Sequence, residues 1–331
     1  MQSAGRAADA ARSALRAALG DRLRAPGPDR TEALAHDNTV LHAPPAVTLM
    51  GGALRVVRVT LPAVAVFEGF LDGIQQSTMI AYLDGVPLLH GTAAAVIRMR
   101  DASGRMQTWA EPLMAHGGYV SRRMLGAALW AQVEGILGTK GQSLHDTDTP
   151  ASLASRHPSA LLRQGLDALS RVRNDLERDA GDAWCAAHGD RPLYVDGSLR
   201  TSATMLRSAG VVGVVKSHAT LYVPDADLPR VLSLDAGERT SLIAVMGAEG
   251  RSRYLTWYLR LRSAAGRDPF FGLIRVEIGA GARDAGDAEA RADEASSALL
   301  AERAPLAKPD GRWDVMPYAI RDCEVYLRAV A

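Results

Sequence analysis

The chain has 331 residues, and its 38 basic and 37 acidic side chains leave a formal net charge of only +1. Hydrophobic residues make up 47% and charged residues 23%, a composition typical of a globular protein that buries a sizeable core. The balanced charge excludes a basic surface over the whole molecule, so any nucleic-acid-binding surface must be a local patch. Two cysteines are too few for a disulfide framework or a cysteine-based zinc site.

The distribution of apolar residues argues against a membrane protein. No run of about 18 apolar residues occurs, so we expect no membrane span and no membrane partner. Charged residues interrupt the N-terminal region, which therefore lacks the apolar stretch of a signal peptide. We expect a cytoplasmic protein.

The first hundred residues predict one helix followed by strands. Residues 4–24 have an Ala- and Arg-rich amphipathic pattern, and a polar connection follows. The apolar run Ala63–Val66 indicates a buried strand within a strand region at 54–72. Asp84-Gly85 between two apolar runs predicts a hairpin, and residues 101–104 predict a second hairpin turn.

The rest of the chain mixes helical and strand patterns. Residues 121–187 are expected to be mostly helical, with an exposed polar loop at 138–150. Further strands are expected at 192–196, 211–217, 241–246, 254–261 and 273–278, and further helices at 201–208, 284–303 and 316–330. This order predicts an α/β fold with a mixed β-sheet flanked by helices. We divide the chain into an N-terminal helix and connection (1–50) and one domain (51–331) with a helical insertion at about 121–187.

Two Asp-Gly steps follow apolar runs that are typical of buried strands. Asp72 follows Phe67–Leu71, and Asp196 follows Leu193–Val195. A carboxylate at the end of a buried strand costs free energy unless a cation or a hydrogen-bond donor compensates it. One such step alone is most simply a turn. Two of them together favour a metal site.

The chain resembles the NurA family of nucleases from about Phe67 to Leu327. The resemblance is carried by Leu71-Asp72-Gly73, Arg171–Glu177, Tyr194-Val195-Asp196-Gly197-Ser198-Leu199, Val211–Ser217 and Phe271–Glu277. It implies a ribonuclease H-like, Piwi-related fold, which an acid-bearing first strand followed by an antiparallel meander also suggests. The chain departs from the family at Asp72-Gly73-Ile74, where Asp-Gly-Ser is usual. It also departs at Tyr318–Glu324, where the family often has a His.

The resemblance implies a metal-dependent deoxyribonuclease that acts in DNA end resection. Such enzymes are single-strand endonucleases and 5′-3′ exonucleases, and they work as homodimers with a HerA-type hexameric ATPase. The chain has no Walker motif, which agrees with a motor supplied by a partner. Phosphodiester cleavage needs a water nucleophile, charge neutralisation and a stabilised leaving oxygen. Two Mn²⁺ or Mg²⁺ ions held by carboxylates supply all three.

The expected metal ligands are Asp72, Glu177, Asp196 and Asp322, with Glu324 as the alternative fourth acid. Glu177 takes this role by resemblance, because its surroundings alone are equally typical of a solvated helix face. Lys216 ends an apolar strand, where its ammonium group either holds the scissile phosphate or reaches solvent.

Several arginines are candidates for DNA contacts. Strand alternation places Arg98 and Arg100 on one face of their strand and Arg260 and Arg262 on one face of another. Arg275 lies on a third strand. We predict that phosphates along a DNA channel are contacted by Arg98, Arg100, Arg260 and Arg275, although such spacing is also typical of solvated faces. The N-terminal helix and the 284–303 helix are assigned to dimer or motor contacts. Two other readings stay open: a non-catalytic DNA-binding or scaffold subunit of a HerA-type complex, and an RNA-directed ribonuclease H-like enzyme.

Overall fold

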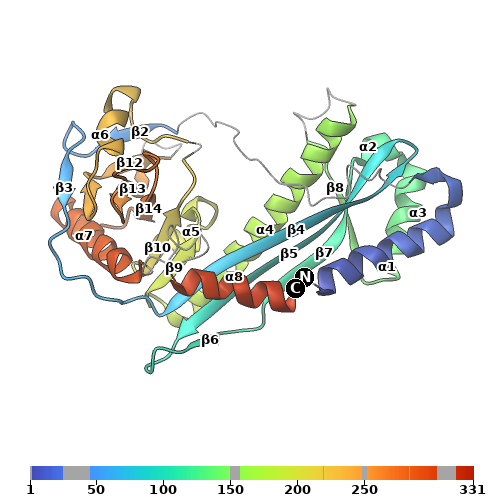
Figure 1. Ribbon diagram of the computed structural model, residues 1–331, viewed down its shortest axis with the longest axis horizontal. Coiled ribbons are helices and arrows are strands. Elements are labelled where there is room, and N and C mark those ends of the chain that lie inside the picture. The colour runs from blue at the N-terminus through green and yellow to red at the C-terminus, as the bar shows by residue number, and fades with distance from the viewer. Residues whose placement is uncertain are drawn as a thin grey trace.

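The computed structural model describes residues 2–24, 45–149, 157–218, 220–247, 252–282, 284–303 and 318–331. Within these residues the strands form one mixed sheet of fourteen strands, and helices flank it (Figure 1). The predicted α/β fold with a mixed, helix-flanked sheet is therefore confirmed. Most of the connection expected at 25–45 lies outside the described residues.

The middle of the sheet consists of a meander joined to parallel strands. In sheet order its strands are β7 (Leu113–Val120), β5 (Val86–Arg100), β4 (Gly69–Leu83), β9 (Leu193–Asp196), β10 (Val211–Val215) and β14 (Leu273–Gly279). β5 lies between β4 and β7 and pairs with each of them antiparallel. β9 runs parallel to β4, β10 runs parallel to β9, and β14 is antiparallel to β10.

β4 and β5 form a long hairpin that extends away from the rest of the sheet (Figure 1). Its turn is Asp84-Gly85, with φ of 49° and 86°, so both residues are left-handed as a type I′ turn requires. This confirms the predicted hairpin. The second predicted turn, at 101–104, is also present and leads into β6 (Met106–Thr108). β4 pairs with β9 only as far as Leu71. Near the hairpin turn, the short strand β1 (Leu23–Arg24) pairs with β4 at Tyr82 and Leu83.

Helices cover both faces of the hairpin, and this explains why β5 is apolar on both sides. α4 (Pro158–His188) packs on one face through side chains such as Leu169. α1 (Gln2–Leu19) and α8 (Tyr318–Val330) pack on the opposite face, through Leu15 and Ile320 respectively. The predicted amphipathic N-terminal helix therefore exists, and it buries its apolar stripe on the hairpin.

The other end of the sheet forms a β-lobe, which we define as the strands beyond β10 together with α7 (Figure 1). Its strands besides β14 are β2 (Val47–Leu49), β3 (Val56–Arg58), β11 (Glu238–Thr240), β12 (Ile243–Met246) and β13 (Ser252–Arg260). Its helix is α7 (Ala285–Glu302). Two short helices, α5 (Ala203–Arg207) and α6 (Leu228–Leu232), lie in the connections between β9 and β10 and between β10 and β11, respectively. Because β2 pairs with β12, residues before position 50 already belong to the lobe's sheet.

Four local expectations differ from the structure. The run Ala63–Val66 is not a buried strand: it has no strand partner among the described residues, and Val64 is 55% exposed. Asp72 lies inside β4 rather than at its end. The polar segment 138–150 contains a strand, β8 (Ser143–Asp146), which pairs with β7. The helix expected from residue 121 is broken at Gly126, whose φ of 78° ends α2 (Arg122–Leu125) before α3 (Ala127–Gly138) begins.

No helix in the described parts of the chain has both the length and the apolar character needed to cross a membrane.

Candidate active site

Asp72 and Asp196 lie on neighbouring parallel strands. Leu71 of β4 is in register with Val195 of β9, so the two aspartates occupy the next position on each strand. Two residues earlier, the rings of Phe70 and Tyr194 lie side by side, with centroids 6.0 Å apart and planes tilted by 31°, and alternation places both aspartates on that same face. Asp72 is only 8% exposed. The topology thus brings together the two acids that the sequence singles out.

Glu177 approaches the same place from α4, on the opposite face of the sheet. Gly73 faces α4, and a Cβ atom at this position would lie 2.9 Å from Cγ of Glu177, closer than such contacts occur. The Glu177 side chain therefore occupies the space that Gly73 leaves free. Arg173, one helical turn earlier, lies 3.4 Å from its carboxylate (Nε to Oε1).

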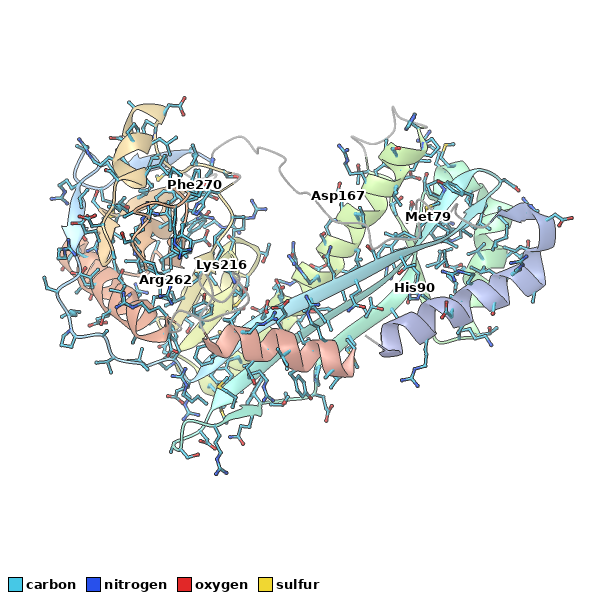
Figure 2. All side chains as sticks on the ribbon, viewed as in Figure 1. Met79, His90, Asp167, Lys216, Arg262 and Phe270 are labelled. Atoms are coloured by element: carbon cyan, nitrogen blue, oxygen red, sulfur yellow. The ribbon has the colours of Figure 1, made fainter. Side chains whose placement is uncertain are left out.

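Lys216 follows β10 and completes the group. Its Nζ donates to Oδ2 of Asp196 over 2.6 Å, and its side chain is 23% exposed. Figure 2 shows Lys216 at the β-lobe end of the hairpin, whereas Met79 and His90 lie farther out along it. We call Asp72, Glu177, Asp196 and Lys216 the acid cluster. Lys216 therefore pairs with a carboxylate instead of only reaching solvent.

Burial dominates the electrostatics of the acid cluster. Burial, and then the nearby Asp196 carboxylate, raise the pKa of Asp72 well above its usual range; Glu177 adds to this rise, while Lys216 opposes it. Burial also raises the pKa of Glu177 to about 7, with Arg173 lowering it and Asp196 raising it. Asp196 therefore acts on both of the other carboxylates, although the three come from distant parts of the sequence. A cluster of this kind favours bound protons or cations.

The carboxylates are not arranged as a ready-made metal centre. Among the described residues, no group of three or more His, Cys, Asp or Glu side chains is disposed to hold a metal ion. Each acid has a nearer partner instead: Asp196 bonds to Lys216, and Glu177 faces Arg173. Asp72 accepts a hydrogen bond of 2.8 Å from the Gly73 N–H. The ligand types suit a hard divalent cation, because all are carboxylate oxygens.

The expected fourth acid, Asp322, is engaged elsewhere. Its Oδ2 accepts from Nε of Arg98 over 2.6 Å, so it fastens α8 to β5. Its neighbour Cys323 lies closer to the acid cluster: its buried thiol donates to the Phe70 carbonyl. Burial, and then the Asp72 carboxylate, raise the pKa of this thiol. Glu324, the alternative, is paired with arginines of its own helix.

The four arginines predicted to contact DNA are bound within the protein. Arg98 pairs with Asp322, as described above. Arg100 donates two hydrogen bonds to the Glu302 carboxylate, at 2.8 and 2.6 Å. Arg260 is fully buried and donates to backbone carbonyls of four residues, which makes it an organiser of loops. Arg275 is 5% exposed and pairs with Glu277. Alternation predicts the faces correctly, but those faces are covered by other elements.

Sequence reasoning misses Glu277, a fully buried acid on β14. It accepts hydrogen bonds from the Ser198 hydroxyl and from the Leu199 N–H, both at 2.8 Å. These donors belong to the turn that directly follows Asp196. The available signal is a pair of charges at alternate positions, Arg275 and Glu277, within an otherwise apolar strand. On a strand buried on both faces, such a pair indicates a polar network rather than a solvated face.

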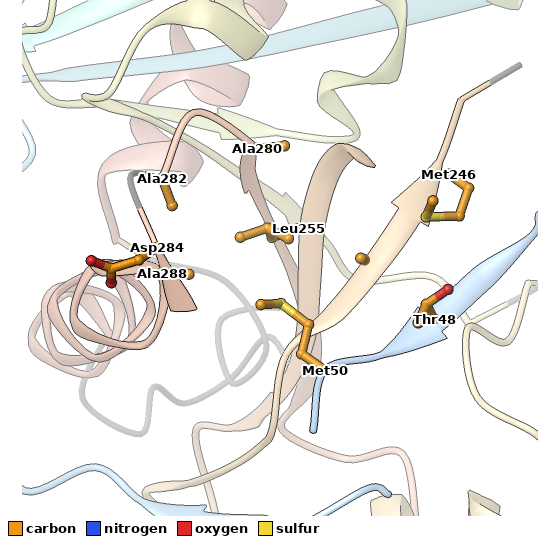
Figure 3. Close-up of a pocket in the computed structure, with 9 residues that line it drawn as sticks. Thr48, Met50, Met246, Leu255, Ala280, Ala282, Asp284 and Ala288 are labelled. Carbon is orange, nitrogen blue, oxygen red and sulfur yellow. The ribbon is translucent and has the colours of Figure 1, made fainter. Parts of the chain in front are cut away.

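The most prominent pockets lie away from the acid cluster. Figure 3 shows one of about 330 Å³ between the edge of the β-lobe and the start of α7, lined by residues such as Met50, Leu255 and Ala288. Its one charged lining residue, Asp284, caps α7 by accepting a hydrogen bond of 2.9 Å from the Asp287 N–H. The lining is apolar and offers no cluster of chemically active groups.

Comparison with models of known protein families finds no match for this chain, and comparison with curated proteins finds none either. The assignment of a function therefore depends on the acid cluster and on the sequence segments described above.

Proposed function

We propose that this protein is a metal-dependent deoxyribonuclease similar to the NurA family, with the acid cluster as its active site. The observation that carries the proposal is that burial and the Asp196 carboxylate raise the pKa of both Asp72 and Glu177, which approach Asp196 from a different strand and from a helix. Burying several carboxylates together costs free energy, and the stability of the fold does not require it. Such sites are therefore candidates for function.

The strand arrangement supports a ribonuclease H-like fold. An antiparallel meander begins on β4, which bears Asp72, and two further strands follow parallel to it, of which β9 bears Asp196. An acid on the first strand, a second on the adjacent parallel strand and a third on a helix crossing them agree with the arrangement that the resemblance implies.

Each member of the acid cluster has a role in this proposal. Asp72, Asp196 and Glu177 would hold one or two Mn²⁺ or Mg²⁺ ions. Bound ions of this kind activate water and neutralise the charge that develops on the phosphate. Without metal, burial raises the pKa of Glu177 to about 7, so metal binding would displace a proton from this carboxyl group at neutral pH. Lys216 supplies a compact positive charge for the scissile phosphate. In the absence of metal, its ammonium group compensates Asp196.

The biological setting is part of the same proposal. The enzyme would act on DNA ends as a homodimer, in the cytoplasm, with a HerA-type hexameric ATPase supplying the motor that this sequence lacks. Both helices pack an apolar stripe within the chain, α1 on the hairpin and α7 on the β-lobe, so partner contacts would use their outward faces.

A non-catalytic DNA-binding or scaffold subunit is the second candidate. One observation favours it: the described residues contain no preformed metal-binding group. In this case Lys216 and Asp196 would be a permanent ion pair that remains from a lost site.

The two candidates are separated by cleavage and binding assays on the same preparation. We expect the wild-type protein to cleave a single-stranded oligonucleotide in Mn²⁺ and to be inactive in EDTA. Asp196→Asn should lower the rate by at least about a hundredfold and leave DNA affinity nearly unchanged. DNA binding without metal-stimulated cleavage, even with a HerA-type ATPase added, would support the scaffold and reject the nuclease.

A further inference from the structure

The turn that follows Asp196 is folded tightly onto the next strand. Gly197 and Leu199 pack against Gly213 of β10: a Cβ atom at Gly213 would lie 2.8 Å from Cγ of Leu199 and 2.9 Å from the Gly197 carbonyl oxygen. Only glycine allows this approach. The backbone leaving Asp196 is therefore confined on one side by β10.

Glu277 confines the same turn by hydrogen bonds. Gly213 is in register with Glu277 of β14, so the glutamate lies across the strand from the turn. Its Oε2 accepts from both the Ser198 hydroxyl and the Leu199 N–H at 2.8 Å. These two donors lie two and three residues beyond Asp196.

The orientation of Glu277 is itself fixed. Nη1 of Arg275 donates to its other oxygen, Oε1, over 2.5 Å, and also lies 3.2 Å from the Thr256 hydroxyl. The guanidinium group stacks on the Tyr222 ring, 3.8 Å from its centroid. Glu277 is fully buried and Arg275 nearly so. A buried ion pair contributes little net stability compared with apolar residues of similar volume, so stability alone does not explain this one.

We propose that Glu277 is a positioning residue for Asp196. By holding the Ser198 hydroxyl and the Leu199 N–H, it sets the path of the turn and hence the direction of the Asp196 carboxylate on the preceding residue. Glu277 does not touch the reacting groups; it acts through the turn, with Arg275 as its counter-ion. This inference rests on the proposed function, because a direction for Asp196 matters only if that carboxylate holds a metal ion.

Two variants separate the contacts of Glu277. Glu277→Gln keeps the size of the side chain and one acceptor oxygen but loses the ion pair, and Ser198→Ala removes one donor at the surface of the network. Ser198→Thr retains the hydroxyl and serves as the conservative rescue. Asp293→Asn is the matched control, because it neutralises a partner of Arg239, another buried arginine, on α7 and away from the turn.

The measurements are Mn²⁺ affinity by calorimetry on the DNA-free protein, kcat and KM for an oligonucleotide, and Tm. We expect Glu277→Gln to weaken Mn²⁺ binding about tenfold and to lower kcat by a similar factor, with KM for DNA unchanged. Ser198→Ala should act in the same direction with a smaller effect, and Ser198→Thr should resemble the wild type. Asp293→Asn should lower Tm and leave Mn²⁺ affinity and kcat at wild-type values.

Different results would overturn the two proposals. If the wild type binds Mn²⁺ and cleaves DNA while Glu277→Gln and Ser198→Ala lower only Tm, as Asp293→Asn does, Glu277 is merely structural and the nuclease proposal stands. If Glu277→Gln does not fold, Ser198→Ala decides. Unchanged Mn²⁺ affinity and kcat in Ser198→Ala would reject the positioning role. A loss of both in Ser198→Ala that Ser198→Thr restores would support it. If the wild type neither binds Mn²⁺ nor cleaves DNA, both proposals fail.

Discussion

Gly73 is the residue that lets α4 deliver a carboxylate to the sheet. Its missing side chain leaves the space that Glu177 occupies. Gly73→Ala should therefore push the Glu177 carboxylate away from Asp72 and Asp196 and lower the cleavage rate at least about tenfold. The measurement is kcat with saturating Mn²⁺. Gly135→Ala, on α3, is the control for a glycine replaced far from the site, because an added Cβ there meets no atom within 4 Å. Equal rates for wild type and Gly73→Ala would show that Glu177 has no part in the chemistry.

Glu177 should make the metal-free protein less stable as the pH rises. Its pKa is about 7 in the folded protein, against an ordinary value of 4.5. A carboxyl group with a raised pKa contributes stability below pH 4.5, and this contribution is lost as the pH rises through about 7. Glu177→Gln should thus stabilise the protein by about 3 kcal/mol at pH 8 and by little at pH 4.5. Unfolding by urea in EDTA at the two pH values measures this. A stabilisation that does not depend on pH would contradict the account.

Lys216 tests whether the cluster handles a phosphate. If its ammonium group contacts the scissile phosphate, Lys216→Ala and Lys216→Arg should both lower the cleavage rate by about a hundredfold, because the wide guanidinium fork does not fit a site built for a point charge. DNA affinity should change little. Full activity in Lys216→Arg, with affinity that follows salt concentration, would instead indicate an exposed phosphate contact.

At the level of single residues, the sequence is informative where chemistry and pattern coincide. Asp72 and Asp196 follow apolar runs, and an acid in that position is unusual enough to be noticed. Glu177 cannot be distinguished from its helix neighbours without the resemblance, since only tertiary packing buries it. The partners of the arginines are hidden in the sequence, because alternation gives the face of a side chain but not the element that covers this face. Asp322 and Glu302, which pair with Arg98 and Arg100, come from helices far along the chain.

At the level of elements, α8 is held to the hairpin by Asp322, the residue that the sequence suggests as a metal ligand. Asp322 pairs with Arg98, whose guanidinium group also lies 4.7 Å from the ring centroid of Tyr326. Asp322→Asn should therefore lower the free energy of unfolding by about 1–2 kcal/mol and leave Mn²⁺ affinity unchanged. Urea unfolding and calorimetry on the same sample test both statements. A loss of Mn²⁺ affinity of tenfold or more would restore Asp322 as a ligand.

Most elements are predictable, because their signals are local. The Asp84-Gly85 turn, the helix at the N-terminus and the β-lobe strands β12, β13 and β14 all follow from periodicity and turn residues. The structure of the run Ala63–Val66 could not be predicted in this way, because an apolar run forms a buried strand only if a partner strand is available. The continuity of β4 through Asp72 is also hidden in the sequence. The Asp-Gly pair suggests a turn, whereas pairing with β5 carries the strand through it.

At the level of the whole molecule, one sheet joins the hairpin to the β-lobe, and the acid cluster lies where the two meet. Asp72 comes from the hairpin, Asp196 and Lys216 come from the parallel strands, and Glu177 comes from the helix that crosses them. The sequence predicts the class of fold but not this meeting point, because the pairing of β4 with β9 connects segments that lie far apart in the chain. The two Asp-Gly steps suggest that Asp72 and Asp196 share a site, and only the resemblance adds Glu177 to it.

The central claim is that the acid cluster binds a divalent metal ion, and calorimetric titration of the DNA-free protein with Mn²⁺ at pH 8 tests it most directly. At this pH Glu177 is mostly ionised, so protons compete least with the metal. The account predicts that the wild type binds at least one Mn²⁺ ion per chain, and that Asp72→Asn and Asp196→Asn each weaken this binding at least about tenfold. No Mn²⁺ binding by the wild type, or wild-type binding by both Asp72→Asn and Asp196→Asn, would contradict it.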